Sequence, residues 1–130
     1  MIYLLDSNAV IALFAGHLGF ITRLKHHRPT DVGLSSIVAH ELYFGAYKSR
    51  KQAENLARVE AHLFEVLPFD QQDARQAGEL RAALSVSGTP IGPYDVLIAG
   101  QALAKGLTLI TRNLREFERV PSLLVENWEV

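Results

Sequence analysis

Residues 92–113 read GPYDVLIAGQALAKGLTLITRN, and this stretch decides the fold. Pro93 suits the first position of a helix, where its missing N–H costs no hydrogen bond, and Gly106 suits the position just past the helix end. The residues between them are apolar on nearly every face, which is typical of a buried helix. Residues 107–111 form a short apolar run typical of a parallel strand that is covered on both faces.

A helix followed by such a strand is the second half of a βαβ unit, in which the helix runs antiparallel to the strands. The N-terminus of the helix therefore lies at the carboxyl edge of the sheet, where open α/β sheets bind their ligands. Asp95 is the only acidic residue of this helix and lies in its first turn, and Asn113 follows the strand. We expect both side chains to lie at this edge.

Length and composition predict one domain spanning residues 1–130, because 48 % of the residues are hydrophobic and can form a substantial core. No run approaches the roughly 18 apolar residues of a membrane span, and the N-terminus lacks the features of a signal peptide, so we expect no membrane association. The absence of cysteine excludes a disulfide framework and a thiolate metal site, and it fits a cytoplasmic protein. The net charge of −1 gives no global field that attracts nucleic acid.

The rest of the chain alternates short apolar strands with amphipathic helices. We expect further strands at residues 2–5, 32–35, 66–68 and 123–125, helices at 9–15, 19–26 and 37–47, a fourth helix ending near Phe64 with Leu56, Val59 and Leu63 at helical spacing, a helix beginning at Asp70, and a polar turn at 116–118. This alternation predicts an α/β fold, a three-layer α/β/α sandwich with a central five-stranded parallel sheet.

Three carboxylates are expected at the carboxyl edge of this sheet. Asp6 ends the first strand, Glu41 lies in the second turn of the helix after the second strand, and Asp95 opens the buried helix. Each has a structural alternative: Asp6 suits a helix N-cap, and Glu41 suits a half-exposed helix position. Clustered carboxylates raise each other's pKa and cost stability unless a cation neutralises them. Mg²⁺ or Mn²⁺ takes such oxygen ligands and activates water against a phosphodiester, so the pattern predicts metal-dependent hydrolysis.

Other phosphate chemistries lack their motifs. The chain has no Walker-type loop, no Gly-x-Gly-x-x-Gly after a strand and no Gly-x-Ser-x-Gly elbow. Asp6 is not followed two residues later by a second aspartate, which disfavours an aspartyl-phosphate phosphatase. The five histidines are scattered, and we interpret them as surface or binding residues: His17, His26, His27, His40 and His62.

Four segments resemble the motifs of PIN-domain ribonucleases and, among these, most closely those of the VapC toxins of type II toxin–antitoxin modules. The segments are LLDSN at 4–8, SSIVAHELYFGA at 35–46, PIGPYDVLIAG at 90–100 and LITRNLREFERV at 109–120. The resemblance covers essentially the whole chain. It implies a PIN-like fold and a Mg²⁺-dependent endoribonuclease, with Mn²⁺ as an alternative ion, that is usually a homodimer and is inhibited by a small cognate antitoxin.

The resemblance also implies roles for single residues. Asp6, Glu41 and Asp95 match three acidic positions of the family, as catalytic residues and metal ligands, and either Glu116 or Asn113 matches the fourth. Many relatives have threonine at the position of Ser7, so the hydroxyl is kept. The remaining polar residues of these motifs are expected to position the carboxylates or the substrate: Ser7, Asn8, Thr111 and Asn113.

Two surfaces are expected to bind macromolecules. Arg112 and Arg115 follow the strand that delivers Asn113, so they can hold RNA phosphates beside the acidic site. The helices around residues 37–64 carry more large apolar side chains than are needed to cover one sheet. We expect a groove there that includes Tyr47 and Leu56 and binds an amphipathic segment of the antitoxin.

Two alternatives to a ribonuclease toxin acting on structured RNA stay open at this point. A PIN-like fold with weak or no catalysis can serve as an RNA- or protein-binding regulatory module, although such a module has no need of three converging carboxylates. DNA flap cleavage uses similar metal chemistry, but a chain of 130 residues leaves no room for the clamp elements expected of a flap nuclease.

Overall fold

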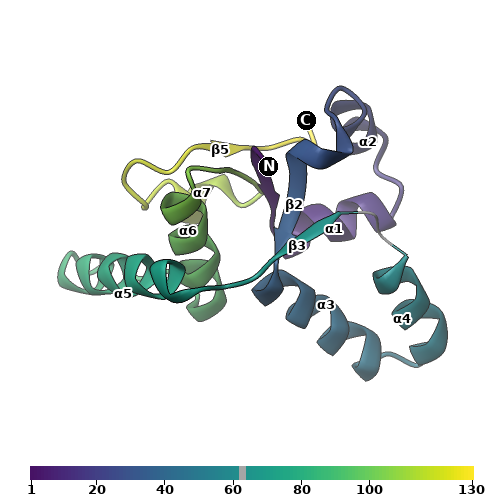
Figure 1. The fold of residues 1–130 in the computed structure, drawn as a ribbon, viewed down its shortest axis with the longest axis horizontal. Coiled ribbons are helices and arrows are strands. Elements are labelled where there is room, and N and C mark those ends of the chain that lie inside the picture. Colours follow the sequence, from purple (N-terminus) through teal and green to yellow (C-terminus); the bar gives the residue numbers. More distant parts are fainter. Residues whose placement is uncertain (62–63) are drawn as a thin grey trace.

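In the computed structural model, which describes residues 1–61 and 64–130, five strands of this part of the chain form one parallel sheet in the order β3-β2-β1-β4-β5 (Figure 1). The strands are β1 (Tyr3–Leu5), β2 (Val32–Ser35), β3 (Glu65–Leu67), β4 (Thr108–Ile110) and β5 (Val125–Glu126). The central strand β1 pairs with both β2 and β4, so that Leu5 lies opposite Leu34 and Ile110. The polar residues that follow these three strands therefore lie at one edge of the sheet.

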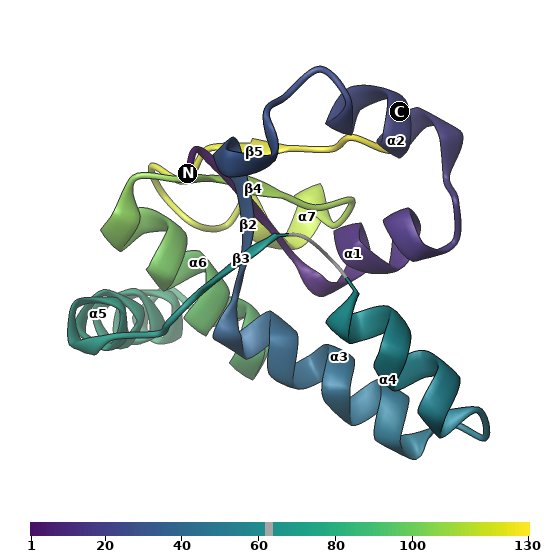
Figure 2. The same cartoon turned by 45° about the vertical axis from the view of Figure 1, so that its right-hand side comes forward.

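Helices cover both faces of the sheet. They are α1 (Ser7–Phe14), α2 (Leu18–Leu24), α3 (Ser36–Lys48), α4 (Gln52–Glu60), α5 (Gln71–Val86), α6 (Pro93–Lys105) and the short α7 (Leu114–Phe117), with a 3-10 turn at Pro29–Asp31. Figures 1 and 2 show α5 and α6 on one side of the sheet, α1 and α2 on the other, and α3 and α4 as a hairpin that extends below it. The predicted three-layer α/β/α architecture is confirmed.

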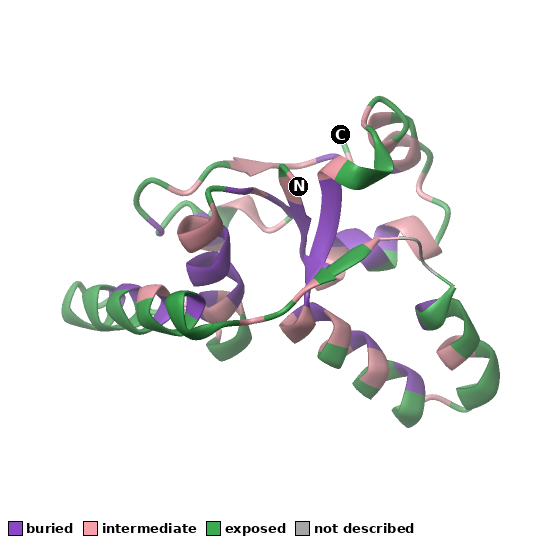
Figure 3. Cartoon of the chain, viewed as in Figure 1, coloured by how far each residue is buried: buried purple, intermediate pink, exposed green. Residues whose placement is uncertain are grey.

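The central strands have buried apolar side chains on both faces. Leu4, Leu5, Leu34, Leu109 and Ile110 are fully buried, and Figure 3 shows β2 and most of β1 coloured as buried. A strand covered by helices on both faces needs apolar residues at every position, which explains the continuous apolar runs of the sequence. The edge strand β3 differs, because Glu65 and Val66 are exposed.

Helix α6 forms as the sequence predicts. It begins at Pro93 and ends at Gly106, whose φ of 66° is the left-handed conformation that glycine adopts without strain. A Cβ atom added to Gly100 would lie 2.5 Å from the Cα of Ala77, so α5 and α6 touch at this point. The helix is therefore fixed between β4 and α5, with its N-terminus at the carboxyl edge of the sheet.

Three expectations about the elements need correction or fall outside the structure. Residues 116–118 do not form a simple turn, because Leu114–Phe117 is helical, and a helix of four residues is too short to show an apolar period. The fifth strand begins at Val125, later than expected, because Ser122 has a φ of 68° and turns the chain first. The fourth helix was expected to end near Phe64, but α4 ends at Glu60. Two residues named in the sequence analysis, His62 and Leu63, lie outside the described residues.

Within residues 1–61 and 64–130, no single helix is both long and apolar enough to cross a membrane. Only α1 and α2 taken together reach that length, and they are bent by 108° with respect to each other.

The contact between α5 and α6 predicts the effect of Gly100→Ala. In an exposed helix interior, alanine stabilises relative to glycine by about 1 kcal/mol. At Gly100 the new methyl group would overlap the backbone of Ala77, so we expect a net loss of about 1–3 kcal/mol in the free energy of unfolding, measured by urea denaturation.

Gly78→Ala is the matched control, because Gly78 lies in α5 and has nothing within 4 Å of an added Cβ. It should be neutral or stabilise by up to about 1 kcal/mol. Equal effects of the two substitutions would show that the α5–α6 contact is not tight.

Candidate active site

Asp6 ends β1 and also caps α1. Its carboxylate accepts a hydrogen bond from the backbone N–H of Ala9 at 2.8 Å, which satisfies one of the free donors of the helix N-terminus. The side chain is nevertheless at the carboxyl edge of the sheet, next to Thr111 at the end of β4. The structural and functional interpretations of Asp6 are therefore compatible.

The surroundings of Asp6 favour its neutral form. Only 4 % of the residue is exposed, and this burial raises its pKa to about 6. Hydrogen bonds from Thr111 and Ala9 oppose the shift, whereas the negative charges of Glu129 and Glu41 add to it. Ionised Asp6 thus lies in a dehydrated site that already contains other negative charges, and a cation there would be favoured.

Asp95 lies against the carboxyl group of Glu116. Helix α6 has Gly92 at its N-cap with no side-chain cap, so Asp95 is free of that role. The pKa of Asp95 is raised to about 7, first by burial and then by its hydrogen bond to the carboxyl group of Glu116, the Glu116 charge and the charges of Asp6 and Glu41. Asp95 therefore retains its proton to about pH 7 in the folded protein.

Glu116 is held in place by two donors. The backbone N–H of Gly92 donates to Oε1 at 2.8 Å, and the side-chain amide of Asn113 donates to Oε2 at 2.7 Å. A Cβ on Gly92 would lie 2.9 Å from Oδ2 of Asp95, so a larger residue at this position would displace the Asp95 carboxylate. Between the two candidates for the fourth acidic position, the geometry brings Glu116 to Asp95 and places Asn113 behind it.

Glu41 is connected to α1 through Ser7. The hydroxyl of Ser7 donates to Oε1 of Glu41 at 2.9 Å, which ties the second turn of α3 to the first turn of α1. Thr111 is buried, and its hydroxyl oxygen accepts the backbone N–H of Asn113 at 3.0 Å while the group also contacts Asp6. Asn8 lies half-buried beside Ser7 in the first turn of α1.

Glu129 also lies beside Asp6, although no sequence pattern predicted it there. Trp128 is fully buried and stacks on His27 with ring centroids 4.8 Å apart, and this anchor places the next residue beside Asp6. The pKa of Asp6 is raised by the negative charges of both Glu129 and Glu41, and the effect of the Glu129 charge is the larger of the two. Its Oε2 atom is buried and has no hydrogen-bond partner among the described residues. Glu129 does not directly follow a strand, because Asn127 and Trp128 separate it from the end of β5, and it opens no helix, so the neighbouring tryptophan was the clearest signal for it.

The two predicted RNA-binding arginines lie on the β4–α7 side of the site, and both are exposed. Oε1 of Glu129 lies 4.0 Å from the guanidinium group of Arg112. Arg115 lines a shallow pocket of about 240 Å³ together with Asn113, Glu116 and Arg119.

The donor set suits a hard cation. No three acidic or histidine side chains within residues 1–61 and 64–130 are already arranged to hold a metal ion. Mg²⁺ does not need such a cage, because it keeps several waters and binds proteins through one or two carboxylates plus substrate phosphates. The oxygens of Asp6 and Asp95 meet this requirement, and their raised pKa values show that an unneutralised charge is costly there.

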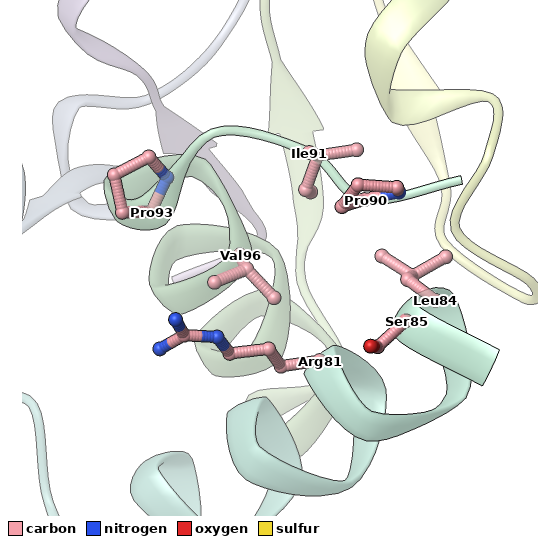
Figure 4. Close-up of a pocket in the computed structure, with 7 residues that line it drawn as sticks. All are labelled: Arg81, Leu84, Ser85, Pro90, Ile91, Pro93 and Val96. Atoms are coloured by element: carbon pink, nitrogen blue, oxygen red, sulfur yellow. The ribbon is translucent and has the colours of Figure 1, made fainter. Parts of the chain in front are cut away.

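A separate pocket lies behind the loop that precedes α6 (Figure 4). It has a volume of about 260 Å³ and is lined by Arg81, Leu84, Ser85, Pro90, Ile91, Pro93 and Val96. The lining contains one cation and no carboxylate, so this pocket is not part of the acidic site. It separates the loop before α6 from the C-terminal half of α5.

Two apolar pockets lie beside α1. The first, of about 190 Å³, is lined by Ile11, Phe14, Glu41, Leu42, Gly45, Ala46, Asn55, Arg58 and Val59. The second, of about 670 Å³, is lined by Leu13, Phe14, Leu24, Lys25, His27, Pro29, Arg58, Ala61 and Phe64. The two pockets share Phe14 and Arg58, and we call them together the α1 groove. Tyr47 and Leu56 line neither pocket: Tyr47 is 59 % exposed, and Leu56 packs against the core.

Comparison with known proteins gives consistent results. The PIN-domain family model matches residues 3–123. The chain is 41 % identical to the tRNA(fMet)-specific endonuclease VapC of Salmonella typhimurium over 97 % of each chain, and 36 % identical to ribonuclease VapC2 of Rickettsia felis over 99 % of each. Among solved structures it is similar to DNA-bound VapBC from Salmonella typhimurium, with a TM-score of 0.93, 40 % identity and 98 % coverage of both chains. It is also similar to VapBC-1 from nontypeable Haemophilus influenzae, with a TM-score of 0.89, 30 % identity and full coverage of both.

The raised pKa values predict how stability depends on pH without metal. In the unfolded chain both aspartates release their protons near pH 3.8, whereas in the folded protein Asp6 and Asp95 keep them to about pH 6 and pH 7. The folded state binds more protons in this interval, so these groups make the protein less stable as pH rises from about 4 to 7. Asp95→Asn should remove the part of this destabilisation that Asp95 causes, and it should raise the free energy of unfolding at pH 8 by about 1–2 kcal/mol.

Urea denaturation in EDTA at pH 5 and pH 8 measures this difference. Glu79→Gln, a substitution on the exposed face of α5, is the control and should leave the pH dependence unchanged. An Asp95→Asn protein that is less stable than the wild type at pH 8 would contradict the predicted repulsion.

Proposed function

Because this chain belongs to the PIN-domain family and, within it, to the VapC ribonucleases, we propose that it is an endoribonuclease toxin inhibited by a cognate antitoxin. PIN-domain VapC nucleases are metal-dependent, and we propose Mg²⁺ as the ion for this chain. The observation that carries the proposal is the convergence of Asp6, Glu41, Asp95 and Glu116 at one edge of the sheet, where burial and mutual repulsion raise the pKa values of both aspartates. A homodimer is proposed on the basis of the family alone.

The proposed mechanism assigns Asp6 and Asp95 as the main metal ligands, with Glu41 completing the pocket. When bound, the divalent cation supplies a water of lowered pKa and offsets the charge that develops on the phosphodiester. The chain contributes orientation: Ser7 holds Glu41, and Asn113 with the backbone of Gly92 holds Glu116 against Asp95. These contacts exist before substrate arrives, so the carboxylates need little rearrangement during the reaction.

RNA is the proposed substrate, and exposed cations lie where its backbone would pass. Arg112 and Arg115 follow β4 on the Glu116 side of the site, so they can bind phosphates next to the bond that is cleaved. The Salmonella relative is named a tRNA(fMet)-specific endonuclease, which makes initiator tRNA the first substrate to test.

The catalytic assignment predicts that Asp6→Asn and Asp95→Asn each reduce cleavage of initiator tRNA in Mg²⁺ at least about 100-fold. Asparagine is as good an N-cap as aspartate, so Asp6→Asn should keep the cap of α1 and the circular dichroism spectrum of the wild type. Gel analysis of the RNA ends measures cleavage, with Glu79→Gln as the unaffected control. Cleavage that persists in either asparagine variant would refute the assignment.

The same assay separates the enzyme from the regulatory module. A wild-type protein that binds the tRNA but does not cleave it in Mg²⁺ or Mn²⁺ would support the binding module instead.

We propose that the antitoxin binds along the α1 groove. The groove is apolar, and one of its pockets includes Glu41 of the acidic site, so a partner in the groove reaches the carboxylates directly. An amphipathic segment would cover the apolar walls, and a basic side chain at its end would pair with the acidic site in place of the metal. VapB–VapC complexes among the similar structures support a protein partner of this kind.

The groove predicts that Ile11→Lys weakens antitoxin binding at least about tenfold, because Ile11 lines the pocket and is 54 % exposed. Titration calorimetry with the purified antitoxin measures this, and RNA cleavage should persist. Tyr47→Lys and Leu56→Lys test the hairpin contacts that the sequence suggested. If Tyr47→Lys weakens binding and Ile11→Lys does not, the antitoxin binds the outer face of α3 instead.

A further inference from the structure

An exposed pair of aromatic rings stands beside the acidic site. His40 of α3 and Tyr94 of α6 contact each other, with ring centroids 5.3 Å apart and planes tilted by 57°. His40 directly precedes Glu41, and Tyr94 directly precedes Asp95. The pair therefore connects the two helices that carry these carboxylates and lies at the rim of the site.

This pair differs from the structural aromatic cluster of the same protein. In that cluster, Tyr3 and His27 pack on Trp128, which is fully buried. His40 is exposed, and Tyr94 is 48 % exposed, so much of its ring faces solvent. Packing of the core does not account for two rings held together at the surface.

The two rings are also held on rigid supports. Tyr94 follows Pro93 in the first turn of α6, which is fixed against α5 by Gly100. The Nδ1 atom of His40 lies 3.3 Å from the carbonyl oxygen of Ile37, which restricts rotation of the imidazole. A surface whose side chains are already oriented loses little conformational entropy when a ligand binds it.

We propose that His40 and Tyr94 form a stacking platform for an unpaired base of the RNA, adjacent to the phosphodiester that is cleaved. Unpaired bases in RNA loops stack on aromatic side chains, and such contacts tolerate any base because every base has a π-face. Purines, with the larger π-surface, are favoured.

This inference rests on the proposed ribonuclease function, and it adds that the enzyme prefers to cleave RNA in a single-stranded loop. The platform would also provide affinity for RNA at a site whose own charge is negative. Four carboxylates repel the RNA backbone, whereas stacking of a neutral base gives affinity that does not depend on charge. Arg112 precedes α7 and Arg115 lies in it, whereas the rings belong to α3 and α6, so the phosphate and base contacts come from different elements around the acidic site.

The platform is tested with an RNA hairpin that carries the fluorescent base 2-aminopurine at successive loop positions. The Asp6→Asn background prevents cleavage. We expect quenching at one loop position, because stacking on an aromatic ring quenches this base. Tyr94→Ala should abolish the quenching and weaken binding about tenfold, and His40→Ala should weaken it less. Tyr94→Phe should behave like the parent protein, since it keeps the ring.

Salt dependence and a matched control separate stacking from general damage. The Tyr94→Ala protein should keep the slope of log Kd against log salt, because loss of a base contact releases no counterions. Phe44→Ala removes an aromatic residue that is 62 % exposed on the same helix as His40, and it should change neither binding nor quenching.

Several results would overturn the platform. Full quenching in Tyr94→Ala, or normal quenching and binding in Tyr94→Leu, would show that the Tyr94 ring does not stack on the base and that the two rings form no joint platform. A change of oligomeric state in Tyr94→Ala, measured by light scattering, would place the rings between copies of the chain. If the parent protein binds no RNA hairpin, the proposed function itself fails, which is distinct from normal RNA binding that is insensitive to Tyr94.

Discussion

The parallel pairing of β1 with both β2 and β4 is the constraint on which the site depends. It places Asp6, the N-terminus of α3 and Thr111 at one edge of the sheet, and the reversal of direction through α6 returns Asp95 to the same edge. A shift of register by one residue would turn the buried side chains of β1 to the opposite face. The core and the acidic site are therefore specified together, and the site inherits the rigidity of the sheet.

The acidic site works against the stability that the core provides. Burial raises the pKa values of Asp6 and Asp95 to about 6 and 7, so near neutral pH the folded protein either retains protons there or bears repelling charges. Elsewhere the chain pairs its buried acid: Asp73 lies 3.4 Å from the ammonium group of Lys105. In the described part of the chain no lysine or arginine forms an ion pair with Asp6 or Asp95, and Arg112 pairs only with Glu129. The proposed divalent cation would supply the positive charge that the two aspartates lack.

Sequence reasoning located residues whose position follows from a strand end or a helix start. Asp6, Glu41 and Asp95 belong to that class, as do the alternating strands and helices. Glu129 does not, because it reaches Asp6 through the burial of Trp128 among Tyr3, Phe20 and His27, which are distant in sequence. The lining of the α1 groove was missed for another reason: Ile11 and Phe14 belong to a short apolar helix whose sequence does not distinguish a covered face from an open one, and only the packing of α2, α3 and α4 shows which face stays open.

Glu41 belongs to both the acidic site and the α1 groove. A partner bound in the groove would therefore contact a residue that is proposed to act in catalysis. Its carboxylate accepts the hydroxyl of Ser7 from α1, the same helix that supplies Ile11 and Phe14 to the groove. An antitoxin segment that packs on these side chains would therefore contact α1, the helix that orients Glu41 through Ser7. This contact would not require a basic side chain of the antitoxin to enter the site. Since the aromatic pair His40 and Tyr94 lies outside the groove lining, an antitoxin in the groove would leave the proposed base platform uncovered and would inhibit at the carboxylates.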